Sequence, residues 1–139
     1  MALCVDASVA LKWFVPEAGQ AEALALRERY ADGERLVVPD LFFVEVANGL
    51  RHHARTGNLT EEELEQAAEL LSALEVDSRS TQHLVTAAVR LAGQLQLTVY
   101  DAMYVAVAQE QQAELWTADM TLHSRAREVL PAAHLLSWR

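Results

Sequence analysis

The chain has 139 residues, of which 52% are hydrophobic and 22% are charged, and it contains only 5 Gly and 3 Pro. This composition excludes a disordered, collagen-like or low-complexity protein and predicts one globular domain over residues 1–139. The 20 acidic residues outnumber the 11 basic residues and give a net charge of −9. That charge argues against nucleic-acid binding through a broad basic surface, but it leaves open binding through metal ions or a few local arginines.

The cellular setting is indicated by the cysteine content and by the start of the chain. Cys4 is the only cysteine and cannot form an internal disulfide, which favours a reducing compartment, the cytoplasm. The apolar opening meets Asp6 at once and has no basic residues before it, so it predicts neither a signal peptide nor a membrane anchor. No later segment reaches the roughly 20 apolar residues that a membrane-spanning helix needs.

Strands and helices are predicted to alternate along the chain. Short apolar runs predict strands at 3–5, 36–38, 115–117 and 134–136. Apolar residues at helical spacing predict helices at 8–14, 17–30, 40–55, 60–74, 80–95, 100–111 and 122–130. Asp40 is the expected N-cap of the third helix, and Thr60 with Glu63 forms a capping box at the start of the fourth.

This alternation predicts an α/β fold, a doubly wound parallel sheet with helices on both faces. In such sheets the ligand site lies beyond the carboxyl ends of the strands, where the strand order reverses. Acidic residues that directly follow strands are therefore the first candidates for a functional site.

Four acids stand in unusually apolar surroundings. Asp6 and Asp119 follow the ends of predicted strands, while Glu45 and Asp101 lie within or beside long apolar runs. Taken singly, each has an ordinary structural explanation: a helix cap for Asp101, turn formation for Asp6 and Asp119, and a surface position for Glu45. Taken together, with two of them at strand ends, they favour a functional cluster.

A cluster of this kind would bind cations. A carboxylate in an apolar setting must be paired, protonated or bound to a cation, and Lys12 is the only lysine in the chain. Converging carboxylate oxygens suit magnesium or manganese. Three polar residues close to the acids in the sequence can orient a carboxylate or hold a metal-bound water; they are Ser8, Asn48 and Thr117.

These motifs, in this order, resemble the PIN domain in its branch of VapC toxins. The resemblance spans nearly the whole chain, and no motif position departs from the family pattern. It rests on the segments Asp6-Ala7-Ser8-Val9 with Lys12-Trp13, Glu45 with Asn48 and Leu50, Tyr100-Asp101-Ala102-Met103-Tyr104 with Ala106 and Ala108, and Thr117-Ala118-Asp119.

The resemblance implies a three-layer α/β/α sandwich with a central parallel sheet of about five strands. It also implies a ribonuclease of a type II toxin-antitoxin system that depends on Mg²⁺ or Mn²⁺, forms a homodimer and is inhibited by a cognate antitoxin. The family's catalytic and metal-binding positions correspond to Asp6, Glu45, Asp101 and Asp119, with Ser8, Asn48 and Thr117 in support.

Two other classes of protein use acidic pockets or this kind of scaffold. A phosphoaspartyl enzyme needs either a second Asp where this chain has Ser8, or a late lysine, and none follows Lys12. A non-catalytic PIN-like binding module remains the alternative, although the chain keeps all four acids. Among the basic residues, Lys12 and Arg51 are the candidates for contacts with RNA because they lie near the acids in the sequence.

Overall fold

A five-stranded, all-parallel sheet forms the centre of the computed structural model, which describes residues 2–138. The strand order is β3-β2-β1-β4-β5. The strands are β1 (Ala2–Val5), β2 (Arg35–Pro39), β3 (Asp77–Arg79), β4 (Ala113–Thr117) and β5 (Ala133–Leu135). The predicted α/β sandwich with a parallel sheet is confirmed.

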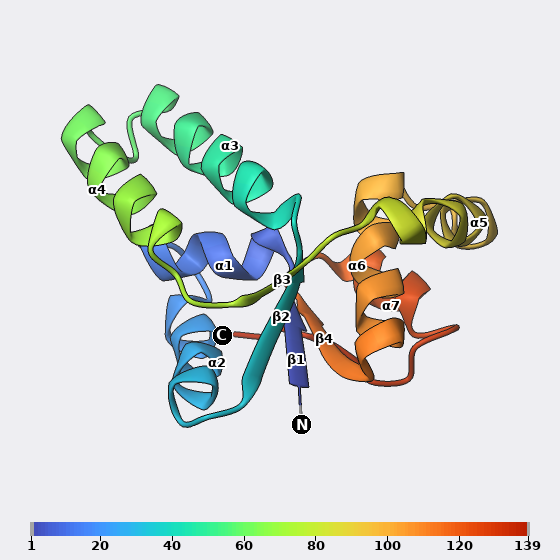
Figure 1. The fold of residues 1–139 in the computed structure, drawn as a ribbon. Helices are drawn as coiled ribbons and strands as arrows, with labels where there is room; N and C mark the ends of the chain where they lie inside the picture. The colour runs from blue at the N-terminus through green and yellow to red at the C-terminus, as the bar shows by residue number, and fades with distance from the viewer. Residues whose placement is uncertain (1, 139) are drawn as a thin grey trace.

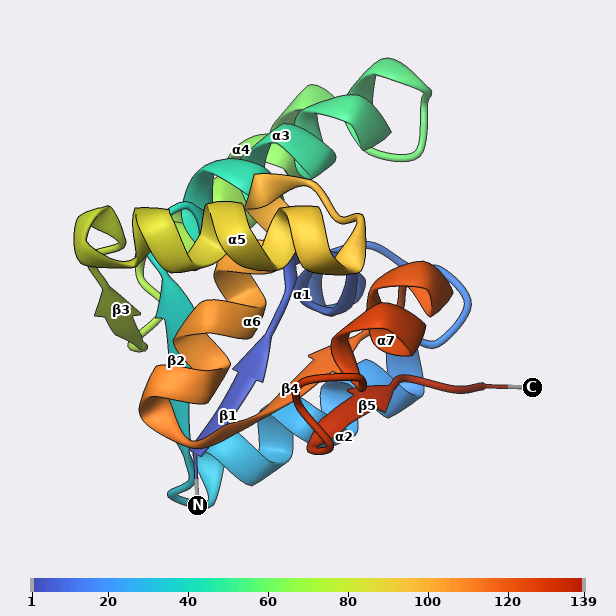
Figure 2. The same ribbon diagram turned by 90° about the vertical axis from the view of Figure 1, so that its right-hand side faces the viewer.

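Helices cover both faces of this sheet (Figure 1). They are α1 (Ala7–Phe14), α2 (Gln20–Ala31), α3 (Phe42–Arg55), α4 (Glu61–Ser72), α5 (Val85–Leu95), α6 (Val99–Gln111) and α7 (Met120–Ala126), with a 3₁₀ turn η1 (Gln82–Leu84) before α5. Helices α1 and α2 lie on one face, whereas α5, α6 and α7 lie on the other, which Figure 2 brings to the front. None of the described helices is both long and apolar enough to cross a membrane.

Strand β1 and its neighbours determine where the strand order reverses, which is where a ligand site is expected. Strand β1 pairs in parallel with β2 on one side and with β4 on the other, with Val5 opposite Trp116. Leu3, Cys4 and Val5 are fully buried, because a strand at the centre of a doubly wound sheet has helices on both faces. From β1 the chain builds outward first through β2 and β3 and later through β4 and β5, so the strand order reverses beside β1.

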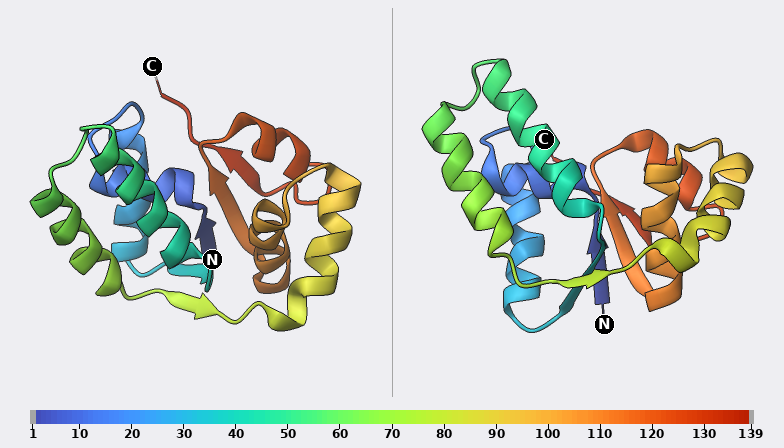
Figure 3. Two further views of the ribbon diagram at one scale, coloured as in Figure 1. Left: turned by 90° about the horizontal axis from the view of Figure 1, so that it is seen from above. Right: turned by 45° about the horizontal axis from the view of Figure 1, so that its top comes forward.

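The helices α3 and α4 form a hairpin at the carboxyl end of the sheet. Seen from that end, the hairpin lies on one side of β1 and β4, and α5 to α7 lie on the other (Figure 3). The hairpin turn is followed by the predicted capping box: Thr60 Oγ1 accepts a hydrogen bond from Glu63 N at 3.0 Å, and Glu63 Oε1 accepts one from Thr60 N at 2.9 Å. This predicted helix start is confirmed.

Strand β3 was not predicted, and the helix expected from Ser80 begins later. Asp77–Arg79 is a short polar edge strand with no apolar run to reveal it, and it pairs with β2. The chain then forms η1, and α5 begins only at Val85. The prediction of Asp40 as an N-cap is also wrong: α3 begins at Phe42, and Asp40 Oδ1 instead accepts a hydrogen bond from Thr81 Oγ1 at 3.1 Å.

Two helices are shorter than the apolar pattern indicates. Helix α2 begins at Gln20 rather than Glu17, because Gly19 precedes it with a left-handed φ of 88° that breaks any helix running through it. Helix α7 ends at Ala126 rather than near Leu130. Neither difference moves the acidic positions.

Candidate active site

Asp6 is held at the end of β1 by three neutral hydrogen-bond donors. Its Oδ1 accepts from Ser8 Oγ at 2.6 Å and from Val9 N at 3.2 Å, and its Oδ2 accepts from Thr117 Oγ1 at 2.6 Å. The bond from Val9 makes Asp6 the N-cap of α1. Its backbone N–H also donates to Trp116 O at 3.2 Å, which ties the residue to β4.

The two hydroxyls around Asp6 have fixed directions. Ser8 Oγ accepts from Ala118 N at 2.9 Å, and Thr117 Oγ1 accepts from Asp119 N at 3.0 Å. Each hydroxyl has a single proton, and each can use it to bond one oxygen of Asp6. The turn after β4 therefore orients both hydroxyls toward the carboxylate.

Burial dominates the protonation of Asp6. The side chain is only 5% exposed, and desolvation raises its pKa from 3.8 to about 6, although the hydrogen bonds from Ser8, Thr117 and Val9 act in the opposite direction. The negative charge of Asp101 raises this pKa further. Asp6 thus carries a charge that its surroundings do not neutralise.

Glu45 and Asp101 approach this point from two helices. Glu45 lies in the first turn of α3, and Asp101 lies in the first turn of α6, which Thr98 caps. Burial raises the pKa of each carboxyl, and the charge of Asp101 adds to the rise at Glu45. Glu45 Oε1 accepts a hydrogen bond from Tyr104 Oη at 2.8 Å.

Asp119 is the N-cap of α7. Its Oδ1 accepts from Thr121 N at 2.8 Å and from Leu122 N at 3.1 Å. Its negative charge raises the pKa of Asp101. Asp6 and Asp119 are therefore both helix N-caps, as their positions in the sequence allow, and both also belong to the acidic cluster.

The four acids form one electrostatic group centred on Asp101, whose charge acts on Asp6 and Glu45 and which itself feels Asp119. Within residues 2–138, none of the four forms an ion pair with a lysine or arginine. In the same part of the chain, no three acidic, histidine or cysteine side chains lie close enough together to hold a metal ion jointly. The acids are thus within reach of each other's charge without forming a closed ligand shell.

This donor set fits a hard divalent cation. It consists of carboxylate oxygens whose charged forms are disfavoured by burial and by one another, and whose bonded neighbours are neutral donors. A cation relieves both penalties, and Mg²⁺ and Mn²⁺ prefer oxygen ligands of this type.

The predicted supporting and RNA-binding residues differ in their surroundings. Ser8 and Thr117 bond Asp6 as described, whereas Asn48 is exposed on α3, one turn after Glu45. Lys12 is wrong as an RNA contact because it is buried: its Nζ donates to Ala18 O at 2.7 Å.

Lys12 has further partners that explain its burial. Its Nζ lies 3.2 Å from Glu17 Oε1 and 4.6 Å from the ring centre of Trp138. The single lysine therefore holds the loop before α2 and the C-terminal segment together, and its charge is already compensated.

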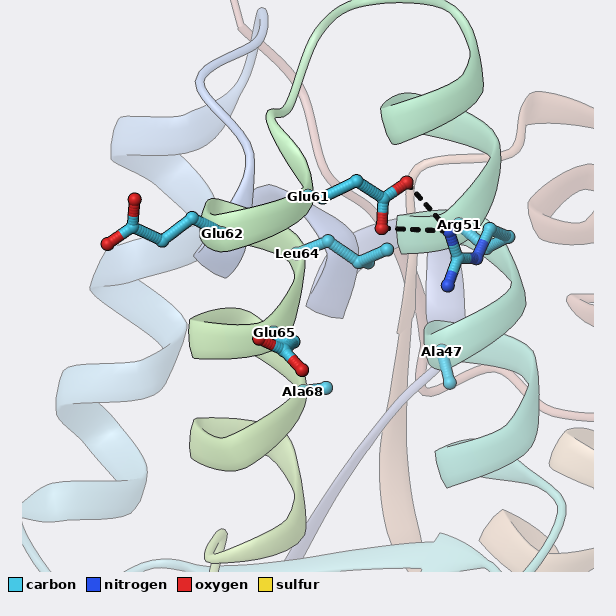
Figure 4. A pocket seen from close by; sticks show the side chains of 7 residues that line it. All are labelled: Ala47, Arg51, Glu61, Glu62, Leu64, Glu65 and Ala68. Carbon is cyan, nitrogen blue, oxygen red and sulfur yellow. Dashed lines mark hydrogen bonds and ion pairs between the residues drawn. The ribbon is translucent and has the colours of Figure 1, made fainter.

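A groove of about 610 Å³ lies between α3 and α4 and is lined by none of the four acids (Figure 4). Arg51, the other predicted RNA contact, lies on its wall and bonds Glu61 through Nη1 at 2.9 Å. The remaining lining residues are Ala47, Glu62, Leu64, Glu65 and Ala68. Arg51 is thus paired with a carboxylate of the neighbouring helix rather than directed at the acidic cluster.

Tyr104 stands in the motif that carries the family resemblance, but its role as the hydrogen-bond partner of Glu45 was not predicted. A usable signal was present: Tyr104 is the one polar side chain in the apolar run Ala102–Ala108, and it follows Asp101 by three residues, on the same side of a helix. The ring is almost fully buried, at 1% exposure.

Comparison with known proteins identifies the family of this chain. The family model described as PIN domain matches residues 3–128. The chain belongs to the PIN domain family. It is 38% identical over 126 residues to a protein named Ribonuclease VapC3 from Pyrobaculum aerophilum, a match that covers 88% of this chain and 92% of the relative.

Solved structures share the fold. The crystal structure of PAE2754 from Pyrobaculum aerophilum superposes with a TM-score of 0.68 at 25% identity, covering 96% of this chain and 82% of that one. A toxin-antitoxin complex from Klebsiella pneumoniae matches with a TM-score of 0.70 at 16% identity, covering 99% of this chain and 100% of that one. The predicted membership of the VapC branch of PIN domains is confirmed.

Proposed function

We propose that this PIN domain is a VapC-type endoribonuclease that hydrolyses RNA phosphodiester bonds with Mg²⁺ or Mn²⁺ at the acidic cluster. The observation that carries the proposal is the group of carboxylates at Asp6, Glu45 and Asp101, each with a raised pKa and none paired with a lysine or arginine in residues 2–138. Such unneutralised charge at the reversal point of a parallel sheet is typical of a functional site.

The metal ligands in this proposal are Asp6, Glu45, Asp101 and Asp119. A divalent ion held there would supply Lewis acidity, which lowers the pKa of a water molecule and stabilises negative charge on the phosphate and the leaving oxygen. The neighbouring polar side chains hold these ligands in position. Ser8 and Thr117 fix both oxygens of Asp6, and Asn48, one turn after Glu45 on α3, would orient a carboxylate or hold a metal-bound water.

The net charge of −9 is compatible with RNA as the substrate. Cations bound by the four acids would reverse the local negative field that otherwise repels a phosphate backbone. With Lys12 buried and Arg51 paired with Glu61, phosphate contacts through the metal site carry more of the binding than a basic surface does.

We further propose that a cognate antitoxin inhibits this activity and that the protein acts as a homodimer in the cytoplasm. The likeness to a toxin-antitoxin complex supports the first partner, and the single buried thiol of Cys4 suits a reducing compartment. The family match over residues 3–128 supports treating the chain as one PIN domain. Sedimentation velocity of the purified chain tests the dimer, which has twice the mass of 15.4 kDa.

Cleavage of RNA by the purified protein tests the enzymatic proposal. We expect Mg²⁺ or Mn²⁺ to support cleavage and EDTA to stop it, and we expect the variants Asp6→Asn and Asp101→Asn to be inactive while remaining folded. Asp32→Asn, an exposed turn substitution, is the matched control and should cleave normally. Wild-type rates in either site variant would refute the assignment.

The alternative function is a non-catalytic PIN-like module that acts only by binding proteins. It predicts no metal-dependent cleavage by the wild type and no effect of the Asp6→Asn substitution on complex formation. The carboxylates of Asp6, Glu45 and Asp101 favour the enzyme, because they are buried or half-buried without a basic partner in residues 2–138 and a pure binding module gains nothing from that cost.

A further inference from the structure

The hydroxyl of Tyr104 connects the buried core to the acidic cluster. Its ring is 1% exposed, and its Oη donates to Glu45 Oε1 at 2.8 Å, across a separation of 59 residues in sequence. The residues around it on α6, from Ala102 to Ala108, are otherwise apolar. A phenylalanine would fill the same space in the core, so the hydroxyl adds only the hydrogen bond to the Glu45 carboxylate.

Tyr104 joins the two helices that bring acids to the cluster. It follows Asp101 by about one turn on α6, while Glu45 comes from α3. Helix α6 packs against β1, β2 and β4, so its position is fixed by the sheet. A hydrogen bond from this helix restricts the rotamers of Glu45, which is half-buried on α3.

The bond occupies only one oxygen of Glu45. In the described part of the chain, Oε2 takes part in no hydrogen bond or ion pair, so it is the oxygen left to meet a cation. Tyr104 is at the same time close enough to Asp6 for that charge to act on the phenol. The hydroxyl thus lies among the acids and not at a remote part of the core.

We propose that Tyr104 is a positioning residue for divalent-metal binding: its hydroxyl holds Glu45 Oε1 so that Oε2 faces the metal site. This inference rests on the proposed function and extends it to a residue outside the acidic quartet. Groups that orient a metal ligand usually change metal affinity by about 10-fold to 100-fold when they are removed. A Tyr104 that only filled the core would leave that affinity unchanged.

The test is binding of Mn²⁺ alone to the metal-free full chain, measured by isothermal titration calorimetry. We expect Tyr104→Phe to keep the ring in place and to weaken Mn²⁺ binding by about 10-fold. The Mn²⁺ concentration for half-maximal RNA cleavage should rise by the same factor, and most of the lost rate should return at saturating Mn²⁺. The matched control is Tyr30→Phe, which removes a hydroxyl from α2, away from the acids, and should bind Mn²⁺ like the wild type.

A double-mutant cycle separates positioning from packing. If Tyr104 acts through Glu45, the Tyr104→Phe substitution should have little further effect on Mn²⁺ binding in a Glu45→Gln background. An unchanged Mn²⁺ affinity in Tyr104→Phe, or an equal loss in both backgrounds, overturns the inference. A lowered melting temperature with wild-type affinity is the signature of a merely structural role.

The same measurements distinguish this inference from the proposed function. If the wild type binds no Mn²⁺ and cleaves no RNA, the proposed function fails. If the wild type binds Mn²⁺ and Asp6→Asn does not, while Tyr104→Phe matches the wild type, only the role of Tyr104 is refuted.

Discussion

Replacing Asp6 by Asn should make the metal-free protein more stable at alkaline pH. Burial raises the pKa of Asp6 from 3.8 to about 6, and this difference corresponds to about 3 kcal/mol at roughly 1.4 kcal/mol per pH unit. Because the folded-state pKa lies above the unfolded value, the contribution to stability is fully present below pH 3.8. It is lost as the pH rises through 6.

The substitution also changes hydrogen bonds, but this effect does not depend on pH. Asn retains one acceptor for Ser8 and Val9 but presents an amide N–H₂ toward Thr117, which costs about 1 kcal/mol. We therefore expect Asp6→Asn to gain about 2 kcal/mol over the wild type at pH 8 and to lose about 1 kcal/mol at pH 3.5. The change of about 3 kcal/mol between the two pH values is independent of the hydrogen-bond cost.

Urea unfolding in EDTA at several pH values measures this change through the shift in the transition midpoint. Asp32→Asn removes a charge from an exposed turn and should stay within about 0.5 kcal/mol of the wild type. A change below about 1 kcal/mol for Asp6→Asn between pH 3.5 and 8 would show that the carboxylate is hydrated or already neutralised, and the reasoning from burial would be refuted.

Three other perturbations probe the metal site and the scaffold. Millimolar Mn²⁺ should stabilise the wild type and raise its melting temperature; at 100 times Kd the added stability is about 2.7 kcal/mol. The rise should be smaller for Asp101→Asn, and equal shifts in a thermal scan would contradict metal binding at Asp101. Thr60→Ala removes the capping box and should cost about 1 kcal/mol in urea unfolding, with RNA cleavage per folded molecule unchanged. Gly19→Ala should cost at least about 1 kcal/mol in urea unfolding, since φ is +88° and the new Cβ would lie 2.7 Å from Trp138 Cε3; a neutral result would contradict the left-handed backbone conformation at Gly19.

The sequence predicted the parts of the fold that depend on burial. Strands β1, β2 and β4 were found as apolar runs because both of their faces are covered. Strand β3 was missed because Asp77–Arg79 is held at the sheet edge by backbone pairing with β2 and by no burial of its own. Asp40 looks like a helix cap in the sequence, but its partner, Thr81, lies 41 residues away.

The acidic positions were predictable for a different reason. Asp6 and Asp119 adjoin strand ends, and the reversal point of a parallel sheet brings such ends together. The partners of the acids were less accessible to sequence reasoning. The bond between Tyr104 and Glu45 depends on how α6 packs beside α3, and the burial of Lys12 depends on a loop and a C-terminal tryptophan that fold over it.

The contacts of Asp6 show why this cluster is suited to a cation and not to a fixed internal partner. Three hydrogen bonds lower the pKa of Asp6, yet burial still raises it to about 6. An arginine beside Asp6 would neutralise the carboxylate permanently, and the carboxylate would then have little tendency to bind a cation. Neutral donors from Ser8 and Thr117 instead fix the direction of the carboxylate while its charge remains uncompensated. A divalent ion bound beside Asp6 would relieve this penalty, which amounts to about 3 kcal/mol for the shift from 3.8 to about 6.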